Sequence, residues 1–401
     1  MNILFLSPRF PLPADTGGKI RTFNILKQLA KFAKVHLLCF SFETADKNYI
    51  KNFQDLGISV ALVEIENPNI FIKISGVFFN PIPFSISKYY SIRMRQAIED
   101  TLKRQTFEAI HVDHLHLASY TGCFNNTSCV LDEHNVEFRI LERCAEVENS
   151  LLKRILYFQQ AQKMKSFESQ KLKDFDAIFA CSLDDQKILE KIGTIQTPVY
   201  VIPNGVDTEY FNTTLMKSLE EDALVFTGSM DWLPNDDAIS YFCRHILPLI
   251  WQKKPKVKFY VVGKNPSSLV KDLAKNDSRV IVTGRVDDVR PFIERSKVFI
   301  VPLRIGGGTR LKILEAMSMG KAVVSTTIGA EGIACQEGID IFLGDSPQEF
   351  ADKVLILLED HQQAKNLGLA SRNLVCRQYD WNSIGKELKK NYEGLNGVKK
   401  E

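Results

Sequence analysis

The sequence predicts an α/β protein made of two doubly wound, parallel-sheet domains that face each other across a cleft. Short apolar runs alternate with amphipathic stretches along all 401 residues, which is the pattern of parallel strands covered by helices. The series of strands is interrupted once, at the turn-forming residues Pro203–Asp207, and then starts again. Sheets of this kind bind ligands at the carboxyl ends of their strands, so we expect the functional residues in the loops that follow the strands.

The first domain is predicted from seven short apolar runs that indicate buried strands. Between the first two strands, apolar residues recur every three or four positions from Ile20 to Ala30, which predicts a helix. Glu137–Lys173 is rich in Lys, Arg, Glu and Gln, which predicts a solvated helical hairpin. The predicted strands are Ile3–Leu6, Val35–Phe40, Val60–Ile65, Ala109–Val112, Cys129–Leu131, Ala177–Ala180 and Val199–Ile202.

The second domain is predicted from five further strands. We expect the first domain at residues 1–203, a linker at 204–222 and the second domain at 223–375. Residues 376–401 are expected to form a C-terminal helical segment that packs back on the first domain. The predicted strands of the second domain are Ala223–Phe226, Phe259–Val262, Val280–Val282, Val298–Val301 and Ala322–Ser325.

Composition and charge exclude several classes of protein. Hydrophobic residues make up 45% and charged residues 25% of the chain, which excludes an intrinsically disordered protein. The net charge of +3 argues against a dedicated nucleic-acid binder. We find no run of about 18 apolar residues, and the apolar start Met1–Ser7 is too short for a signal peptide, so we expect a cytoplasmic protein. The eight cysteines form no C-x-x-C pair, which argues against zinc and redox motifs.

Residues 67–95 could contact a membrane. Aromatic and basic side chains alternate there, a composition that can lie on an anionic membrane or hold a lipid-linked acceptor. The same pattern also fits a helix that packs its aromatic side chains inward. Under the first interpretation the protein is peripheral to the inner face of the membrane.

The most informative motif is a glycine loop after the predicted strand Val298–Val301. Gly306, Gly307 and Gly308 leave backbone N–H groups unshielded, so phosphate oxygens can approach them closely. Thr309 follows, and then a helix whose positive N-terminal end points toward the loop. This arrangement indicates a binding site for phosphate groups.

Three charged residues follow the glycines. Arg310 and Lys312 add full positive charges to the loop and the start of the helix, and Glu315 lies about one turn inside the helix. A carboxylate at that position can accept hydrogen bonds from ribose hydroxyls. The alternative interpretation is a tight turn with a surface Lys312–Glu315 pair.

Two further groups of residues lie at strand ends in the first domain. Gly17 and Gly18 open the first helix and could face phosphates or an acceptor, although an ordinary helix start is equally consistent with the pattern. His111–His116 ends one strand and Asp132–Glu137 ends the next. Their imidazole and carboxylate groups could form a general-base site or a metal site, but the spacing matches no zinc signature, so we expect no metal.

Together these motifs resemble glycosyltransferase family 4, the group 1 glycosyl transferases, which have the GT-B architecture of two Rossmann-like domains. The resemblance spans nearly the whole chain and is most specific at Gly306–Met317 and the following Gly320–Val324. The polar patch at Asp132–Glu137, with His111–Asp113 before it, resembles a subgroup involved in polysaccharide assembly. Other matching segments are the Pro-rich Gly-Gly loop near the N-terminus, Ile202–Asp207, Phe226–Ser229 and Thr283–Val286.

The resemblance implies an enzyme that transfers a sugar from a nucleoside diphosphate sugar to a hydroxyl of a glycan, lipid-linked or other acceptor, in cell-surface polysaccharide or glycoconjugate biosynthesis. Members mostly retain the anomeric configuration and need neither a bound metal nor another cofactor. Asp113, with His134 nearby, matches the polar group close to the transferred sugar. The residues that the resemblance places on the donor are Gly17, Gly18, Gly228, Arg285, Val286, Gly307, Gly308, Thr309, Arg310 and Glu315.

The sequence departs from the family pattern at three positions. The first Glu of the family's E-x7-E motif falls on Gly307, and the Arg and Lys that many members place after the first strand of the second domain fall at Ser229 and about Asn235. These departures keep open a catalytically inactive nucleotide-sugar-binding protein, and a sugar-nucleotide epimerase shares the same architecture. The residues left to neutralise a departing diphosphate are Arg310, Lys312 and Arg304.

Overall fold

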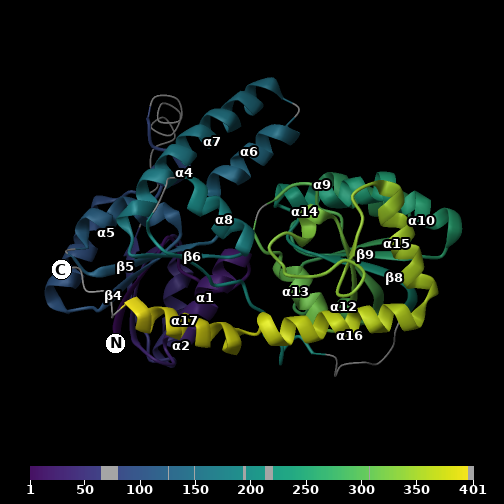
Figure 1. Cartoon of the computed structure of the whole chain (residues 1–401). Helices are drawn as coiled ribbons and strands as arrows, with labels where there is room; N and C mark the ends of the chain where they lie inside the picture. The colour runs from purple at the N-terminus through teal and green to yellow at the C-terminus, as the bar shows by residue number, and fades with distance from the viewer. Residues whose placement is uncertain are drawn as a thin grey trace. The chain divides into compact units, whose positions relative to one another are not determined.

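The structure is a computed structural model that describes residues 1–64, 80–124, 126–148, 150–192, 196–212, 220–306 and 308–395. It consists of two compact units (Figure 1). The first comprises Met1–Pro203 and the chain from Ile384 onward, and the second comprises Asn204–Ser383. Each unit contains one parallel sheet with helices packed against it, which confirms the predicted class of two doubly wound α/β domains.

The sheet of the first unit has the strand order β3-β2-β1-β4-β5-β6-β7, and every pairing is parallel. The central strands are apolar and fully buried because helices cover both faces. In the register of β4 and β5, Asp113 lies opposite Asp132 at the carboxyl ends of both strands. The strands are β1 (Asn2–Ser7), β2 (Lys34–Ser41), β3 (Ser59–Glu64), β4 (Ala109–Asp113), β5 (Ser128–Glu133), β6 (Ala177–Ala180) and β7 (Val199–Val201).

Among the helices of this unit, α6 (Glu137–Val147) and α7 (Leu151–Lys171) form the predicted helical hairpin. The hairpin extends away from the sheet of its own unit (Figure 1). The remaining α-helices are α1 (Gly17–Leu29), α2 (Ile50–Gln54), α4 (Phe84–Ser87), α5 (Ile92–Arg104) and α8 (Leu183–Ile192). The 3-10 helices are η1 (Thr44–Tyr49), η2 (Leu115–Cys123) and η3 (Leu172–Asp174).

The last described helix, α17 (Trp381–Leu395), belongs to the first unit from Ile384 onward. The hydroxyl oxygen of its buried Tyr392 lies 2.6 Å from Nδ1 of His111, a residue of β4. Gly385 packs against the side chain of Gln28 in α1, where a β-carbon would clash with the amide. The helix is therefore tied to the core of this unit by a buried polar contact and a close approach.

The sheet of the second unit has the order β10-β9-β8-β11-β12-β13, again with parallel pairings. Five of its strands were predicted from their apolar runs. The sixth, β13, pairs through only two residues, which is too short to give a periodic signal. The strands are β8 (Glu220–Thr227), β9 (Lys258–Val262), β10 (Val280–Gly284), β11 (Ser296–Val301), β12 (Ala322–Ser325) and β13 (Phe342–Leu343).

The helices of the second unit cover both faces of this sheet (Figure 1). The functional motif lies between β11 and α13, and β11 is the direct neighbour of β8 in the sheet. The helices are α9 (Leu233–Tyr241), the π-helical turn η4 (Phe242–Ile246), α10 (Leu247–Lys253), α11 (Ser268–Asn276), α12 (Arg290–Arg295), α13 (Leu311–Ser318), α14 (Thr327–Ala330), α15 (Pro347–Glu359) and α16 (His361–Gln378).

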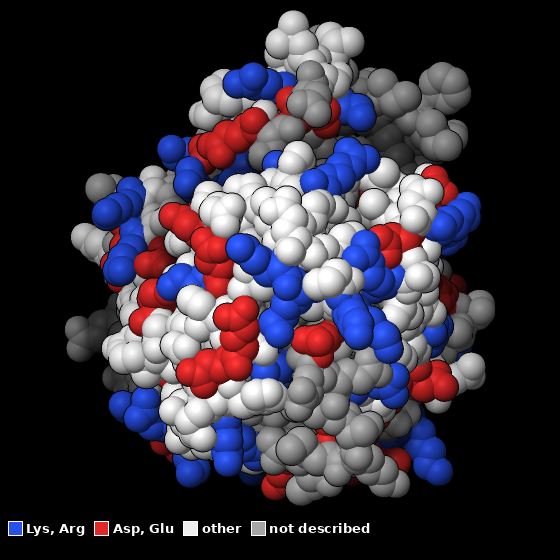
Figure 2. Space-filling view, turned by 90° about the vertical axis from the view of Figure 1, so that its right-hand side faces the viewer, with Lys and Arg blue, Asp and Glu red and all other residues white. Residues whose placement is uncertain are grey.

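The surface carries both signs of charge. On the face shown in Figure 2, Lys and Arg are interspersed with Asp and Glu and no continuous field of one sign forms, in line with the small net charge. Within the described residues, no helix is both long and apolar enough to span a bilayer.

Of the aromatic and basic segment 67–95, the structure describes residues 80–95, and residues 65–79 lie outside the described residues. Within residues 80–95, Ile86 and Tyr89 are buried, and Tyr89 packs against Phe40 and His116. Tyr90 stacks on Tyr120. Ile86 and Tyr89 therefore pack inward, whereas Tyr90 and Ile92 have exposed fractions of 51% and 67%. Membrane contact through 67–95 stays a prediction.

Candidate functional site

In the second unit, the glycine loop leads from β11 into α13 and contacts the side chain of Arg310. Arg310 is the residue before α13, and its Nη1 donates a hydrogen bond to the carbonyl of Gly308 at 2.9 Å. The guanidinium packs so closely on Gly306 that a β-carbon there would clash with it. Gly308 has φ +69°, which favours glycine. Thr309 is buried beside the loop, and Gly307 lies outside the described residues.

Lys312 extends from the first turn of α13 toward the end of β8. Its ammonium donates a hydrogen bond to Oδ1 of Asn235 at 2.8 Å and lies 3.8 Å from the ring centre of Phe226. A β-carbon on Gly228 would lie 2.6 Å from Nζ of Lys312. Only glycine therefore leaves room for the ammonium at this strand end.

Asn235 holds the ammonium in place. Its Nδ2 donates to the carbonyl of Ser229 at 2.7 Å while its Oδ1 accepts from Lys312. Ser229 and Asn235 are the positions where the family pattern places basic residues. The structure thus brings a basic side chain to that region from α13, a helix that begins more than 80 residues after the end of β8.

The alternative of a surface Lys312–Glu315 pair is wrong, because Lys312 turns inward to Asn235 and the described ion pairs do not include Glu315. Burial lowers the pKa of Lys312 well below its usual range, and the nearby charge of Arg310 lowers it further. Burial also raises the pKa of Glu315 to about 7, against the opposing effect of Lys312. A bound anion would raise the pKa of Lys312 again, so Lys312 and Arg310 together favour the binding of an anion.

The other residues predicted on the donor side are Arg285, Val286 and Arg304. Arg285 and Val286 follow β10, at the same carboxyl edge of the sheet as Gly228, and Arg285 is exposed while Val286 packs on the core. Arg304 does not supply free charge to the loop. Its guanidinium pairs with Asp237 at 2.5 Å and lies over the ring of Tyr241, so the expectation that it replaces a missing basic residue is wrong.

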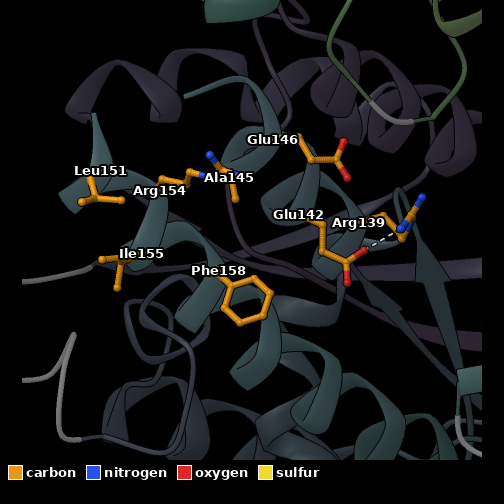
Figure 3. Close-up of a pocket in the computed structure, with 8 residues that line it drawn as sticks. All are labelled: Arg139, Glu142, Ala145, Glu146, Leu151, Arg154, Ile155 and Phe158. Atoms are coloured by element: carbon orange, nitrogen blue, oxygen red, sulfur yellow. Dashed lines mark hydrogen bonds and ion pairs between the residues drawn. The ribbon is translucent and has the colours of Figure 1, made fainter. Parts of the chain in front are cut away.

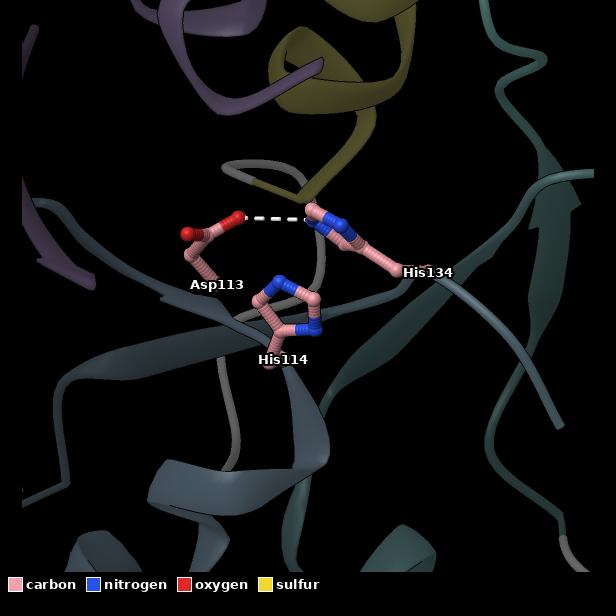
Figure 4. A group of neighbouring side chains, drawn as sticks. All are labelled: Asp113, His114 and His134. Atoms are coloured by element: carbon pink, nitrogen blue, oxygen red, sulfur yellow. Dashed lines mark hydrogen bonds and ion pairs between the residues drawn. The ribbon is translucent and has the colours of Figure 1, made fainter. Parts of the chain in front are cut away.

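In the first unit, Asp113 is the centre of a buried polar network at the end of β4. Its carboxylate accepts hydrogen bonds from Ser7 at 2.7 Å and from Thr22 at 2.9 Å, and Nε2 of His134 lies 2.7 Å from Oδ1. Figure 4 shows this last contact, with His114 beside both groups. The two residues that the sequence suggested here, Asp113 and His134, are thus in direct contact.

His114 and His134 form a closely packed pair with ring centres 3.5 Å apart. Burial alone would lower the pKa of His134, but the charges and hydrogen bonds of Asp113 and Asp132 raise it above the usual value. Burial and the charge of His134 hold the pKa of His114 well below its usual range. His134 therefore favours the protonated form and His114 the neutral form. Two neighbouring imidazoles with pKa values shifted in opposite directions are suited to proton transfer. Gly18, at the start of α1, lies against both rings, whereas Gly17 is exposed.

Two imidazole nitrogens at this edge are unsatisfied. Nδ1 of His114 and Nδ1 of His116 are buried and have no hydrogen-bond partner among the described residues. The backbone of His114 has φ +79°, which is uncommon for a residue with a side chain. Buried polar atoms without partners are costly, so these nitrogens mark a polar position at the carboxyl edge of the sheet that an ordered water or a ligand group would satisfy.

A second buried contact next to Asp113 was not predicted from the sequence. The guanidinium of Arg21 binds Asp132 through two nitrogens, at 2.5 Å from Nη2 to Oδ1 and 3.0 Å from Nε to Oδ2, and its Nη1 donates to the carbonyl of Pro203. Arg21 lies on the same face of α1 as the buried Ile25 and Leu26. In the sequence, the position of Arg21 among the apolar residues of this helix was the feature that could have predicted a buried acidic partner.

Three sets of side chains have the residue types of a metal site, with their potential ligand atoms within 4.8 Å of one another. In two of them, Asp113 and Asp132 already accept hydrogen bonds from protein donors. In the third, burial lowers the pKa of His116 to about 3, and the charge of Arg9 acts in the same direction. The guanidinium of Arg9, which disfavours a positive charge on His116, also disfavours a metal ion there. The residues of the third set therefore fit a metal poorly. The three sets are Asp113, His114 and His134; His111, Asp113 and Asp132; and His114, His116 and Glu137.

Two family models match the chain. One described as Glycosyltransferase Family 4 matches residues 16–210, and one described as Glycosyl transferases group 1 matches residues 221–360. The first therefore covers most of the first unit, including Gly18, Asp113 and His134, and the second covers the glycine loop and α13.

Among curated proteins, an uncharacterized 44.6 kDa protein in the cps region of Klebsiella pneumoniae is 22% identical over 64% of this chain and 68% of that protein. A phosphatidyl-myo-inositol mannosyltransferase of Mycobacterium tuberculosis is 24% identical, but the match spans only 49% of this chain and 54% of that protein. Among solved structures, Anabaena Alr3699/HepE in complex with UDP and glucose has a TM-score of 0.70 at 16% identity, over 98% of this chain and 99% of that chain. At this identity the likeness shows the fold alone.

Proposed function

Since the chain belongs to the family 4, or group 1, glycosyl transferases of GT-B fold, we propose that it transfers a sugar from a nucleoside diphosphate sugar to a hydroxyl acceptor. We further propose that the transfer retains the anomeric configuration, needs no metal and serves the assembly of a cell-surface polysaccharide or glycoconjugate. The observation that carries the proposal is the placement of Lys312 and Arg310 on a glycine-rich strand edge of the second unit.

On the donor side, the leaving group is a nucleoside diphosphate that gains negative charge as the bond from phosphate oxygen to the sugar carbon breaks. Arg310 at the start of α13 offers positive charge, and the ammonium of Lys312 reaches the end of β8. Burial lowers the pKa of Lys312, and a diphosphate bound beside it favours the charged form. Charges fixed before the reaction stabilise the developing negative charge without reorganisation. Together with the backbone of the glycine loop, they take the place of the basic residues missing at Ser229 and Asn235.

On the acceptor side, the buried nitrogens of His114 and His116 support a hydroxyl-bearing ligand in the first unit. Asp113 and His134 would lie close to the transferred sugar, as the family resemblance implies. We propose a front-face transfer in which the acceptor oxygen forms the new bond to the sugar carbon. The acceptor proton then passes to the departing phosphate oxygen, so no covalent enzyme intermediate is needed.

We propose a lipid-linked molecule as the acceptor. By their names, the mycobacterial relative is a mannosyltransferase acting on phosphatidyl-myo-inositol, and a relative in Schizosaccharomyces pombe is a subunit of a phosphatidylinositol N-acetylglucosaminyltransferase. The Klebsiella relative is placed in a cps region. The first two names support a lipid-linked acceptor for this chain.

Glu315→Ala is expected to weaken nucleoside diphosphate binding by about 1.5–3 kcal/mol, because the variant lacks the carboxylate that would accept hydrogen bonds from the ribose hydroxyls. Burial raises the pKa of Glu315 to about 7, so the ionised fraction of Glu315 increases as the pH rises through that value. Nucleotide affinity of the wild type, and not of the variant, should rise over the same interval. Titration calorimetry measures both effects, with the exposed Glu359→Ala as the control. Equal affinities of Glu315→Ala and wild type would remove Glu315 from the site.

The proposed function is tested by turnover of a panel of nucleoside diphosphate sugars, first as slow hydrolysis without acceptor. We expect one donor class to be hydrolysed, with the rate unchanged in excess EDTA, because Lys312 and Arg310 supply the positive field that a metal supplies elsewhere. Activity lost on chelation and restored by magnesium or manganese would contradict metal independence. Nucleotide binding without any hydrolysis would instead identify an inactive nucleotide-sugar-binding protein.

A further inference from the structure

Helix α7 exposes four large apolar side chains within eight residues. Leu151, Leu152, Ile155 and Phe158 have exposed fractions of 70%, 81%, 57% and 58%. Their spacing of one, three and three residues places them along one side of the N-terminal half of the helix. Single exposed apolar residues are ordinary, but a contiguous group marks an interaction surface. We call these four residues the α7 apolar patch.

The α7 apolar patch borders a groove between α6 and α7 with a volume of about 560 Å³. Figure 3 shows its lining, with the ion pair between Arg139 and Glu142 on the α6 side. Ala145 extends the apolar surface across the groove, which Arg154 and the acidic residues Glu142 and Glu146 also line. The hairpin therefore offers an apolar surface with charged groups at its border.

The patch is presented by a firmly held helix. In the C-terminal half of α7, Ala161 and Met164 are buried, and Gln160 accepts a hydrogen bond from the backbone of Phe84 at 3.1 Å. The carboxylate of the buried Glu168 accepts from backbone N–H groups at the start of α6. Because this half is anchored in the first unit, the N-terminal half projects its apolar side chains outward instead of folding them into the core.

The charges of α7 favour an anionic partner, whereas the α6 side of the groove carries Glu142, paired with Arg139, and the exposed Glu146. The basic residues of α7 are Lys153, Arg154, Lys163, Lys165 and Lys171, and its single acidic residue, Glu168, is fully buried. Every charge that α7 shows to solvent is therefore positive. Two-fold pairing of this face with a second copy would bring Lys153 and Arg154 close to the same residues of the other copy, which like-charge repulsion disfavours. Leucine, isoleucine and phenylalanine beside lysine and arginine are the composition of a helix that lies in an anionic lipid interface.

We propose that the α7 apolar patch docks the protein on an anionic lipid bilayer, with Leu152, Ile155 and Phe158 in the acyl boundary and Lys153 and Arg154 on the headgroups. The residues of this surface are not those of the segment 67–95, where we expected membrane contact from the sequence. The inference deepens the proposed function and rests on it, because a lipid-linked acceptor is reached from the bilayer surface.

The test is co-sedimentation of the full chain with vesicles of phosphatidylcholine, with and without phosphatidylglycerol. The wild type should bind the anionic vesicles, and the triple variant Leu152→Ser, Ile155→Ser, Phe158→Ser should bind them at least about ten-fold more weakly. Lys153→Gln with Arg154→Gln should lose the preference for anionic vesicles. The control is a second triple variant, Leu183→Ser, Ile339→Ser, Leu369→Ser, which changes three comparably exposed residues outside the patch. It should bind the vesicles like the wild type.

Hydrolysis of the donor sugar by the triple variant separates this inference from the proposed function. We expect unchanged hydrolysis, since the patch is remote in sequence from the residues assigned to the donor. A wild type that hydrolyses donor but ignores anionic vesicles would overturn the docking surface and leave the function standing. A wild-type dimer that the triple variant converts to a monomer would also overturn it, in favour of contact with a second copy.

Discussion

Replacing Lys312 by methionine is expected to lower kcat/KM for sugar transfer by about 10²–10³, the scale seen when one preorganised electrostatic donor is removed. Methionine nearly preserves the length of the side chain and can pack on Phe226, so the fold should persist. What is lost is the positive charge that Asn235 holds beside Gly228 at the end of β8. Because the interaction of this charge with the leaving group strengthens as the leaving group becomes more negative, the loss should fall mainly on kcat.

Steady-state kinetics of a small series test this role. Asn235→Ala keeps the lysine but removes its acceptor, so we expect an intermediate loss. Lys312→Arg should recover only part of the rate, because a guanidinium is larger than the space between Gly228 and Asn235. Lys353→Met removes a partly exposed lysine of the same unit, paired with Glu337, and serves as the control. If Lys312→Met retains more than about a third of wild-type kcat/KM, a loss below about 1 kcal/mol, the assignment is wrong.

Arg21→Met is expected to lower the free energy of unfolding of the first unit by about 3–5 kcal/mol, the cost of leaving a buried carboxylate without its partner. Arg21 and Asp132 are both buried and joined by two nitrogens. Although burial would raise the pKa of Asp132, the Arg21 charge and the His134 contacts hold it well below its usual range. A carboxyl with a depressed folded-state pKa stabilises the fold above about pH 4, and that stability is lost as the pH falls toward the folded-state value.

Chemical denaturation at neutral and acidic pH measures this effect. The difference between wild type and Arg21→Met should be largest at neutral pH and shrink in acid, where Asp132 becomes protonated in the unfolded state of both proteins. Arg95→Met breaks an exposed pair with Glu99 and should cost only about 0–1 kcal/mol. Adding Asp132→Asn to Arg21→Met should restore part of the stability, because the unpaired charge is removed. A change below about 1 kcal/mol in Arg21→Met would contradict the assigned role of the pair.

Much of the fold was predictable from the sequence because its signals are local. A strand covered by helices on both faces is a continuous apolar run, as in Ile3–Leu6 and Val298–Val301, and a solvated helix repeats its apolar positions every three or four residues. The glycine loop before α13 was equally visible, since consecutive glycines followed by a basic residue at a strand end are typical of a phosphate-binding loop. The short strand β13 was missed because two residues carry no period.

Part of the site was predictable for the same reason. Asp113 and His134 follow neighbouring strands of a parallel sheet, so their meeting depends only on the adjacency of β4 and β5. His114 was grouped with them by position, but its packing on His134 and its neutral state depend on burial, which a local pattern does not reveal. The role of Arg304 was misjudged because its partner, Asp237, lies far away in the sequence, in helix α9.

By itself, the sequence determined the two α/β units, the glycine loop and the family, because these rest on periodicity and on short contiguous motifs. Only the tertiary structure decided which side chains complete the site. Lys312 meets Asn235 across 77 residues of sequence, because β8 and β11 are neighbours and the segments that follow them converge at one edge of the sheet. Arg21 meets Asp132 across 111 residues, because β1 and β5 flank β4 in the first sheet. Such contacts depend on the order of the strands in each sheet. That order is set by the packing of the whole chain and cannot be predicted from any local sequence pattern.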